Sequence, residues 1–198
     1  MMKKSFLLFA IMSVFSATAQ NYSDSVTTLR KEYVETLIDT SNHILNEEEV
    51  TNFKGVEYFP ISESYKVKVT FKKKLGKEFK MPTSGTRTPI YRRYGYIDFE
   101  VNGKKCRLTV YQNVELTKSE DLKDYLFIPF RDATSSHSTY GGGRYLDFSI
   151  PTGTDVIIDF NMAYNPYCAY SHRYSCPIPP VENTLEVEIT AGERYLEH

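Results

Sequence analysis

The sequence has no tryptophan, almost no net charge and no apolar segment of transmembrane length. Its 24 lysine and arginine residues nearly balance its 25 aspartate and glutamate residues, which leaves a net charge of −1. Nucleic-acid binding depends on a clustered basic surface, so this balance argues against a nucleic-acid partner. The main apolar run, residues 5–15, is well short of the roughly 20 residues that a membrane-spanning helix needs. We therefore expect neither a nucleic-acid-binding protein nor an integral membrane protein.

The N-terminal segment has the three parts of a secretory signal peptide. Lys3 and Lys4 provide a positive start, the apolar run over residues 5–15 follows, and Ala17-Thr18-Ala19 supplies the small residues required at the cleavage site. A buried N-terminal helix is the alternative, but the charge, the length and the small residues together favour a signal peptide over residues 1–19. We expect cleavage near Ala19/Gln20 and a periplasmic or secreted protein. No cysteine lies near the cut, so we expect no lipid anchor.

Residues 20–198 are expected to form one β-rich domain, because this part of the chain shows no internal repeat and no linker. The 16 tyrosines are unusually many, and such half-polar rings suit strands, rims and binding surfaces. Export makes a cytosolic nucleotide an improbable cofactor, and we expect no cofactor. The expected partner is an unidentified small molecule or a component of the cell envelope.

Two N-terminal helices are predicted. Residues 23–39 carry apolar side chains at helical spacing, namely Val26, Leu29, Tyr33 and Leu37. A second, short helix is expected to begin at Asn46, followed by three glutamates that suit the positive end of a helix, and to end at Gly55.

The pattern then changes to strict alternation, which is typical of strands. Residues 65–71 alternate apolar and polar side chains, and Asn102-Gly103 has the two residue types of a type I′ hairpin turn. Pairing Val101 with Lys104 places the apolar side chains on one face and two opposite-charge pairs on the other, which predicts the register. The predicted pairs are Phe99 with Cys106, Ile97 with Leu108, Gly95 with Val110, Glu100 with Lys105, Asp98 with Arg107, and Tyr96 with Thr109.

The remaining strands are expected over residues 125–130, 144–150, 156–161 and 184–190, with a turn at Pro151-Thr152-Gly153-Thr154. No helical crossover separates them, so the sheet should be antiparallel. The expected fold class is mainly β: an antiparallel barrel or two-sheet sandwich with one or two N-terminal α-helices.

Two long irregular segments, residues 131–144 and 162–183, are where function is expected, because long loops in a compact domain are commonly functional. The triple glycine at 141–143 does not indicate a phosphate-binding loop, since Arg144 and the residues after it alternate like a strand rather than begin a helix. A tight bend into a strand is the favoured interpretation.

The cysteines favour one disulfide. Cys106 lies on the apolar hairpin face and is expected to be buried. Cys168 and Cys176 are eight residues apart in one loop of an exported chain, so a disulfide between them is favoured. The alternative is a metal site of Cys168, His172 and Cys176, which lacks a fourth ligand and is flanked by prolines.

Several stretches of the chain together resemble the domain-of-unknown-function family numbered 1684, DUF1684. These stretches are Phe130, Asp132 and Thr134; Thr139–Leu146; Asp159-Phe160-Asn161 with Ala163-Tyr164-Asn165-Pro166; Cys168-Ala169-Tyr170; Cys176–Pro180; Asn183; and Ala191-Gly192-Glu193, with Phe53 and Gly55 nearer the N-terminus. That family has no established activity. The resemblance implies that the polar residues of the two loops are where a site should be sought.

Two functional hypotheses follow. The first is a non-enzymatic binding or envelope-associated module with a polar cleft between the two loops; its candidate residues are Asp132, His137, Tyr140, Arg144, Asp159, Asn161, Tyr164 and Asn165. An alternative role for Asp159 and Asn161 is to hydrogen-bond the loop backbone. The second hypothesis is a small exported hydrolase that uses His137 or His172 with Asp132 or Asp159, although no G-x-S-x-G motif is present.

Overall fold

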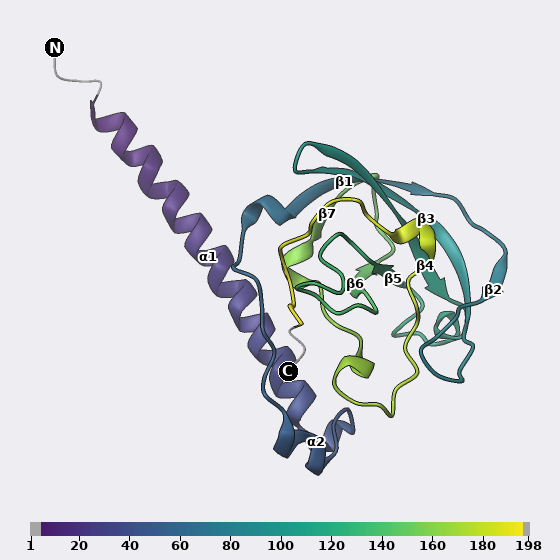
Figure 1. Ribbon diagram of the computed structural model, residues 1–198. Coiled ribbons are helices and arrows are strands. Elements are labelled where there is room, and N and C mark those ends of the chain that lie inside the picture. The colour runs from purple at the N-terminus through teal and green to yellow at the C-terminus, as the bar shows by residue number, and fades with distance from the viewer. Residues whose placement is uncertain (1–4, 196–198) are drawn as a thin grey trace.

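Seven antiparallel strands form one curled half-barrel sheet in the computed structural model, which describes the backbone of residues 5–195 and the side chains of residues 20–195 (Figure 1). The strands are β1 (Lys66–Lys73), β2 (Glu78–Lys80), β3 (Ile90–Val101), β4 (Lys104–Asn113), β5 (Tyr125–Phe130), β6 (Arg144–Ser149) and β7 (Asp155–Asp159). Their order is β6-β5-β4-β3-β1-β7, and β2 pairs with β3. The predicted mainly β, antiparallel fold is confirmed, as a single incompletely closed sheet.

The curl of the sheet brings its two ends toward each other. β6 and β7 lie at opposite ends of the strand order, yet only residues 150–154 connect them. Phe71 of β1 and Phe148 of β6 have ring centroids 6.1 Å apart, although three strands separate β1 from β6 in the order. The seam between the two end strands therefore lies beside a short turn, where the sequence predicted one.

Two α-helices precede the sheet: α1 (Ser5–Ile38) and α2 (Glu47–Asn52). α1 runs along one side of the β-body and projects beyond it (Figure 1). It confirms the helix predicted over 23–39 but begins earlier; the side chains of the predicted signal peptide lie outside the described residues. Among the described residues, no helix combines the length and the apolar character that a membrane span requires.

The start of α2 agrees with the prediction, and its end does not. The Glu49 amide donates to Asn46 Oδ1 at 2.8 Å, and the Asn46 amide donates to Glu49 Oε2 at 2.9 Å, a capping box. The helix ends at Asn52 rather than at Gly55. Short 3₁₀ helices complete the secondary structure: η1 (Thr40–Asn42), η2 (Glu63–Tyr65), η3 (Leu116–Lys118), η4 (Phe160–Met162), η5 (Tyr167–Ala169) and η6 (Val181–Asn183).

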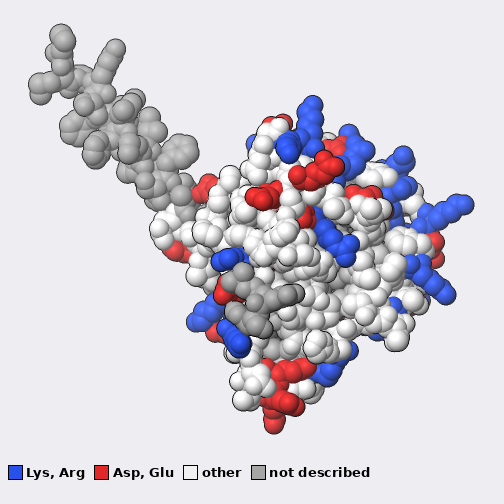
Figure 2. Space-filling model, in the orientation of Figure 1, with Lys and Arg blue, Asp and Glu red and all other residues white. Residues whose placement is uncertain are grey.

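The β3–β4 hairpin has the predicted register at every pair, from Val101 with Lys104 to Gly95 with Val110. Asp98 accepts hydrogen bonds from Arg107 across the hairpin and from Lys72 of β1. The face of the molecule seen in Figure 2 carries charges of both signs. The apolar side packs into the main core with β1, β5 and β6.

A second apolar cluster lies on the other face of the sheet. It consists of Met81, Tyr91, Tyr111, Phe127, Tyr145 and Cys176, with side chains of the 162–183 loop packed against it. Strand alternation explains this arrangement: in β6, Leu146 enters the main core while Tyr145 points to the opposite face. The long loop therefore covers a sheet face that would otherwise be exposed.

The strand predicted over Thr184–Thr190 is wrong. The burial alternates as predicted, with Leu185, Val187 and Ile189 buried. The backbone, however, bonds to the 131–133 segment: the Leu185 amide donates to Arg131 O at 2.8 Å, and the Ala133 amide donates to Val187 O at 3.0 Å. Likewise the predicted strand 156–161 stops at Asp159, where that side chain caps η4 by accepting from the Asn161 amide.

A buried ion pair joins this C-terminal segment to the sheet. Arg144, 1% exposed, donates to Asp132 Oδ1 at 3.3 Å and to the carbonyl oxygens of Ile189, Ala191 and Glu193. Asp132 also accepts from the Ile189 amide at 2.6 Å. The bond to Ile189 O is 2.8 Å long. Because the three carbonyl acceptors belong to every second residue, 189, 191 and 193, the guanidinium holds this segment extended.

Gly143, which precedes this arginine, has a φ of +91°, and a Cβ there would lie 2.6 Å from Phe130 O. Only glycine fits this tight bend into β6. The favoured interpretation of the triple glycine therefore agrees with the backbone.

Replacing Asp132 with alanine should lower the free energy of unfolding by about 3 kcal/mol or more, because it leaves the Arg144 charge buried without a counter-charge. Urea unfolding of the two proteins measures the loss. Asp98→Ala is the matched control: it also removes an aspartate paired with arginine, but a more exposed one, and should lose clearly less. Equal losses would contradict the structural role of the buried pair.

Candidate functional site

A cavity of about 770 Å³ lies where the edges of β6 and β7 meet α1 and the 162–183 loop. This volume is within the usual range for small-molecule sites. Tyrosine dominates its walls: Tyr33, Tyr58, Tyr91, Tyr125, Tyr145, Tyr164, Tyr167 and Tyr174 all line it. Its charged lining residues are Arg30, Arg87, Asp147, Asp159 and Glu193.

Glu193 is the most unusual of these residues. Its side chain is 0% exposed. Oε2 accepts from the Asn165 amide at 2.7 Å and from the Tyr170 hydroxyl at 2.6 Å, whereas Oε1 has no hydrogen-bond partner among the described residues. Burial raises the pKa of this carboxyl from 4.5 to about 7, because an apolar environment disfavours the charged form.

The backbone holds Glu193 in this position. Its amide donates to Ala163 O at 2.8 Å, and the preceding Gly192 has a φ of +76°. A Cβ at Gly192 would lie 2.5 Å from Ala163 O, so only glycine allows the two segments to approach this closely.

Two tyrosine hydroxyls near Glu193 also lack partners. The Tyr33 and Tyr58 hydroxyl oxygens are buried without a hydrogen bond in the described part of the chain, and burial raises the pKa of both phenols. Buried polar atoms are nearly always hydrogen-bonded in native proteins. In the described part of the chain six buried side-chain atoms lack a partner, and three of them, Glu193 Oε1 and the hydroxyls of Tyr33 and Tyr58, are on residues that line this cavity.

Asp147 lies at the exposed rim of the cavity. The hydroxyls of Tyr125 and Tyr164 both donate to its Oδ1 at 2.7 Å. Tyr164 in turn lies against Tyr33, with ring centroids 5.8 Å apart. A row of tyrosines thus connects the rim carboxylate to the buried end of the cavity.

Asp159 and Asn161 fasten α1 to the sheet beside this cavity. The Tyr22 hydroxyl donates to Asp159 Oδ2 at 2.7 Å, and Asn161 Nδ2 donates to the Tyr22 hydroxyl at 2.9 Å. Arg30 donates to Asn161 O, with Nη2 at 2.9 Å. These bonds fix the helix that carries Tyr33. Asp159 and Asn161 therefore have structural partners, but the partners are α1 and Ser62 rather than the backbone of the two long loops.

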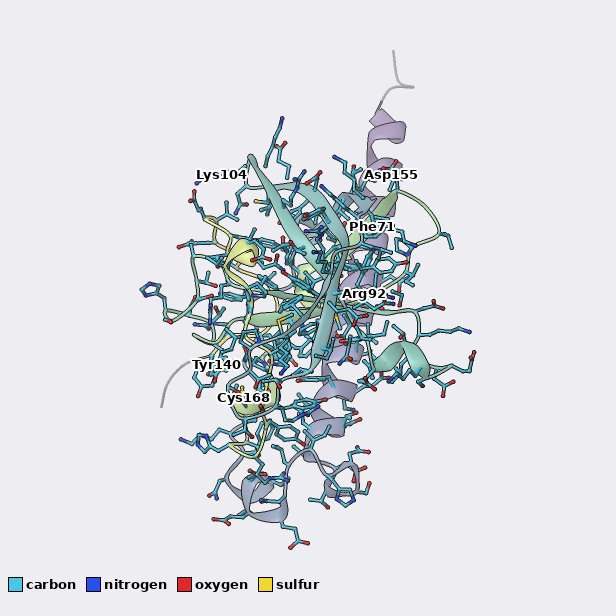
Figure 3. All side chains as sticks on the ribbon, turned by 90° about the vertical axis from the view of Figure 1, so that its right-hand side faces the viewer. Phe71, Arg92, Lys104, Tyr140, Asp155 and Cys168 are labelled. Carbon is cyan, nitrogen blue, oxygen red and sulfur yellow. The ribbon has the colours of Figure 1, made fainter. Side chains whose placement is uncertain are left out.

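The structure separates the eight candidate residues into two groups. Asp159, Asn161 and Tyr164 line the cavity; Asp132, His137, Tyr140, Arg144 and Asn165 do not. Arg144 and Asp132 bond each other in the core, as described above. Buried Asn165 does not line the cavity but positions Glu193: its amide donates to Glu193 Oε2, and its Nδ2 donates to the Tyr170 hydroxyl at 3.2 Å, which binds the same oxygen. Tyr140 lies beside Cys168, and both lie well away from the hairpin tip at Lys104 (Figure 3).

The hydrolase hypothesis finds no support. His137 and His172 are both exposed, and neither side chain hydrogen-bonds to a carboxylate among the described residues. The Asp132 carboxylate is bound by Arg144, Thr134 and the Ile189 amide, and Asp159 is bound by Tyr22 and Asn161. Both aspartates are therefore occupied by structural partners.

Cys168 and Cys176 lie close together as free thiols. The Cys168 amide donates to Cys176 Sγ at 3.3 Å, and no disulfide is formed. The Cys176 thiol, by hydrogen bonding, lowers the pKa of Cys168. No cluster of three or more His, Cys, Asp or Glu side chains suited to a metal occurs in the described part of the chain, so the Cys168, His172 and Cys176 alternative finds no support.

Glu193, Asp147, Tyr33 and Tyr58 were not among the candidate residues. One sequence signal does point to Glu193: residues 185, 187, 189 and 191 alternate inward, and Glu193 continues that parity. A charged residue at an inward-facing position is a sign of a site. No comparable signal marks Tyr33, whose role depends on where α1 lies.

The model of the family described as "Protein of unknown function (DUF1684)" matches residues 51–194. The chain belongs to this family. The match includes Tyr58, Asp147 and Glu193 but not Arg30 or Tyr33. The resemblance inferred from the motifs of the two loops is thereby confirmed.

A solved structure has the same fold. The solution NMR structure of an uncharacterized protein from Haloarcula marismortui is 30% identical to this chain, with a TM-score of 0.68, and the match covers 92% of this chain and 99% of the other. No curated protein matches the sequence significantly.

Glu193→Gln should make stability less dependent on pH. The folded-state pKa of Glu193 is raised, so its contribution to stability is full below pH 4.5 and is lost as the pH rises through about 7. The wild type should therefore lose up to roughly 3 kcal/mol relative to the variant across this range, at about 1.4 kcal/mol per pKa unit. Urea unfolding between pH 4 and 8 measures the difference.

The charged groups that face Glu193 are Arg30 from α1 and Arg144 from β6, and the tyrosines around it are Tyr33, Tyr58, Tyr167 and Tyr170. The same substitution at exposed Glu188, in the same segment, is the control. Parallel stability curves for wild type and Glu193→Gln would show that Glu193 is not buried as described.

Proposed function

We propose that this protein is an exported, non-enzymatic binding module, and that its ligand is a small molecule held in the tyrosine-lined cavity. The observation that carries this proposal is the group of buried polar atoms at the cavity wall: Glu193 Oε1 and the hydroxyls of Tyr33 and Tyr58. Leaving such atoms unpaired costs roughly 1–3 kcal/mol each. A ligand that supplies their hydrogen-bond partners recovers this cost, which favours binding.

The composition of the walls suits a small organic ligand. Aromatic rings provide apolar contact, and a few convergent polar groups orient the ligand, as in many small-molecule sites. Support for a non-enzymatic role comes from the aspartates of the hydrolase hypothesis. Asp132 in the 131–144 loop and Asp159 at the end of β7 are bound to structural partners and are not available as general acids or bases.

The cavity position differs from the cleft expected between the two loops. The 162–183 loop contributes to it through Tyr164, Tyr167 and Tyr174, whereas the 131–144 loop contributes none of the lining residues. α1, the β6–β7 seam, residues of β3 and β5, and Tyr58 and Glu193 contribute to the remaining wall. The proposal therefore keeps the binding function and the tyrosine-rich character, and moves the site to the seam of the sheet.

Export and the disulfide are part of the proposal. Cleavage after Ala19 leaves Tyr22, Arg30 and Tyr33 in the mature chain, so the cavity keeps its helical wall. In an oxidising compartment, a disulfide of the surroundings would supply the oxidant: the Cys168 thiolate would attack it to form a mixed disulfide, and the adjacent Cys176 sulfur would then displace the outer thiol to close the Cys168–Cys176 bond. The bond would brace the loop that covers the cavity.

Filling the cavity mouth should abolish binding. Ile157 lines the cavity and is 54% exposed, so Ile157→Trp narrows the opening with little effect on the core. A mixed library of cationic, neutral and anionic aromatic fragments, followed by backbone amide NMR shifts, supplies the probes. Shifts of cavity residues are expected in the wild type and in the control Val181→Trp, which alters an exposed valine outside the lining, but not in Ile157→Trp. If no fragment shifts the cavity residues of the wild type, the proposed function is wrong.

The intact mass of protein expressed with its native N-terminus tests export and the disulfide together. Protein recovered outside the cytoplasm should begin at about Gln20, and reduction should raise its mass by two hydrogen atoms. Cys168→Ser should remove that increase, and Cys106→Ser should not. Recovery of the uncleaved chain in the cytoplasm would refute export, and an unchanged mass on reduction would refute the disulfide.

A further inference from the structure

The charge balance of the cavity points to a particular class of ligand. Glu193 is a buried carboxylate with one oxygen bound by Asn165 and Tyr170 and the other without a partner. Both existing bonds come from donors, which favour the ionised form, while burial opposes it. A buried carboxylate in this state is completed by a positively charged donor on its free oxygen.

The two nearby arginines do not serve as that donor. Arg30 directs Nε and Nη2 to Asn161 O and Nη1 to Phe59 O. Arg144 directs its terminal nitrogens to Asp132 and to backbone carbonyls. Neither forms a hydrogen bond or an ion pair with the Glu193 side chain among the described residues. Arg144 Nε is buried without a partner, and the other side-chain nitrogens of both arginines bind elsewhere.

The tyrosine rings add a second feature that selects for positive charge. The faces of aromatic rings are electron-rich and attract cations within about 6 Å of the ring centre. The Tyr58 ring already binds a cation of the chain itself, since the Arg30 guanidinium carbon lies 4.4 Å from its centroid, so Tyr58 is expected to meet a ligand through its unpaired hydroxyl. Tyr33 and Tyr164, with centroids 5.8 Å apart, continue the aromatic wall toward the rim.

The rim repeats this combination of carboxylate and tyrosine. Asp147 is exposed, and its two tyrosine donors bind the same oxygen, Oδ1. A carboxylate at the entrance of a cavity raises the local concentration of cations. Arg87 is the exposed basic residue of the lining and lies near Ser175, where its amide donates to the serine hydroxyl.

We propose that the cavity binds an organic ammonium ion, with Glu193 Oε1 as its counter-charge, Tyr33 and Tyr58 around it, and Asp147 attracting it to the entrance. This inference rests on the proposed binding function and specifies its ligand class. Glu193 becomes fully ionised when the cation binds, and the ammonium hydrogens take the place of the missing partner. The ligand's organic part lies against the tyrosine rings.

Three probes of nearly equal shape test the inference by NMR titration at pH 7: 2-phenylethylamine, which is cationic, 2-phenylethanol, which is neutral, and 3-phenylpropanoate, which is anionic. The amine should bind the wild type roughly tenfold more tightly than the alcohol, because it alone forms the ion pair with Glu193. In Glu193→Gln, the affinity for the amine should fall to about the affinity for the alcohol, whereas Glu188→Gln should retain the wild-type preference for the amine.

Asp147→Asn provides a second variant at an exposed position, so the test does not depend on how Glu193→Gln folds. This substitution should weaken binding of the amine and leave the affinity for the alcohol unchanged. The inference is overturned if the amine binds no better than the alcohol, or if its preference survives both substitutions. Binding of the alcohol or the propanoate in the cavity without preference for the amine would refute the cation and retain the binding function; no binding by any probe or library fragment would refute both.

Discussion

The arrangement of the C-terminal third depends on the ion pair and hydrogen bonds that the buried Arg144 guanidinium makes. A charge in the core requires a counter-charge and several acceptors, and here Asp132 and three carbonyl groups of the last segment supply them. The acceptors come from Ile189, Ala191 and Glu193, every second residue. The segment is therefore held extended and in one register without belonging to the sheet.

That register determines the position of Glu193 in the tyrosine-lined cavity. Once Ala191 and Glu193 present their carbonyls to Arg144, the positive φ of Gly192 and its close approach to Ala163 leave the Glu193 side chain among the tyrosines of the seam. The backbone of residues 191–193 thus connects the Arg144–Asp132 ion pair in the core to the Glu193 carboxylate in the cavity. Damage to the core pair is expected to reach the cavity even though neither Arg144 nor Asp132 lines it.

The cavity also shows a conflict between stability and function. An enclosed carboxylate and unpaired phenol hydroxyls are unfavourable in a folded protein, and a wall of apolar residues would be more stable. The protein accommodates them beside α1, whose attachment depends on the Tyr22, Asp159 and Asn161 hydrogen bonds. Such a local cost is consistent with the proposed binding function, because a ligand would supply the hydrogen-bond partners that the protein lacks.

The sequence by itself determined the features that depend on near neighbours. The Asn102-Gly103 turn and the flanking alternation specify the β3–β4 register, because adjacent strands interact through pairs that can be read directly from the chain; the Asn46 and Glu49 capping box is equally local. The family also followed from short motifs. Only the tertiary structure decided that Asp132 and Arg144 are core partners, that residues 184–190 bond to a loop rather than to a strand, and that Tyr33, Asp147 and Glu193 share one cavity. Asp132 and Arg144 are only 12 residues apart, but their burial depends on the segment around Ile189, which lies more than 40 residues from either of them. The other outcomes also depend on contacts between distant segments, and a polar residue looks the same in a sequence whether its partner is the core, solvent or a ligand.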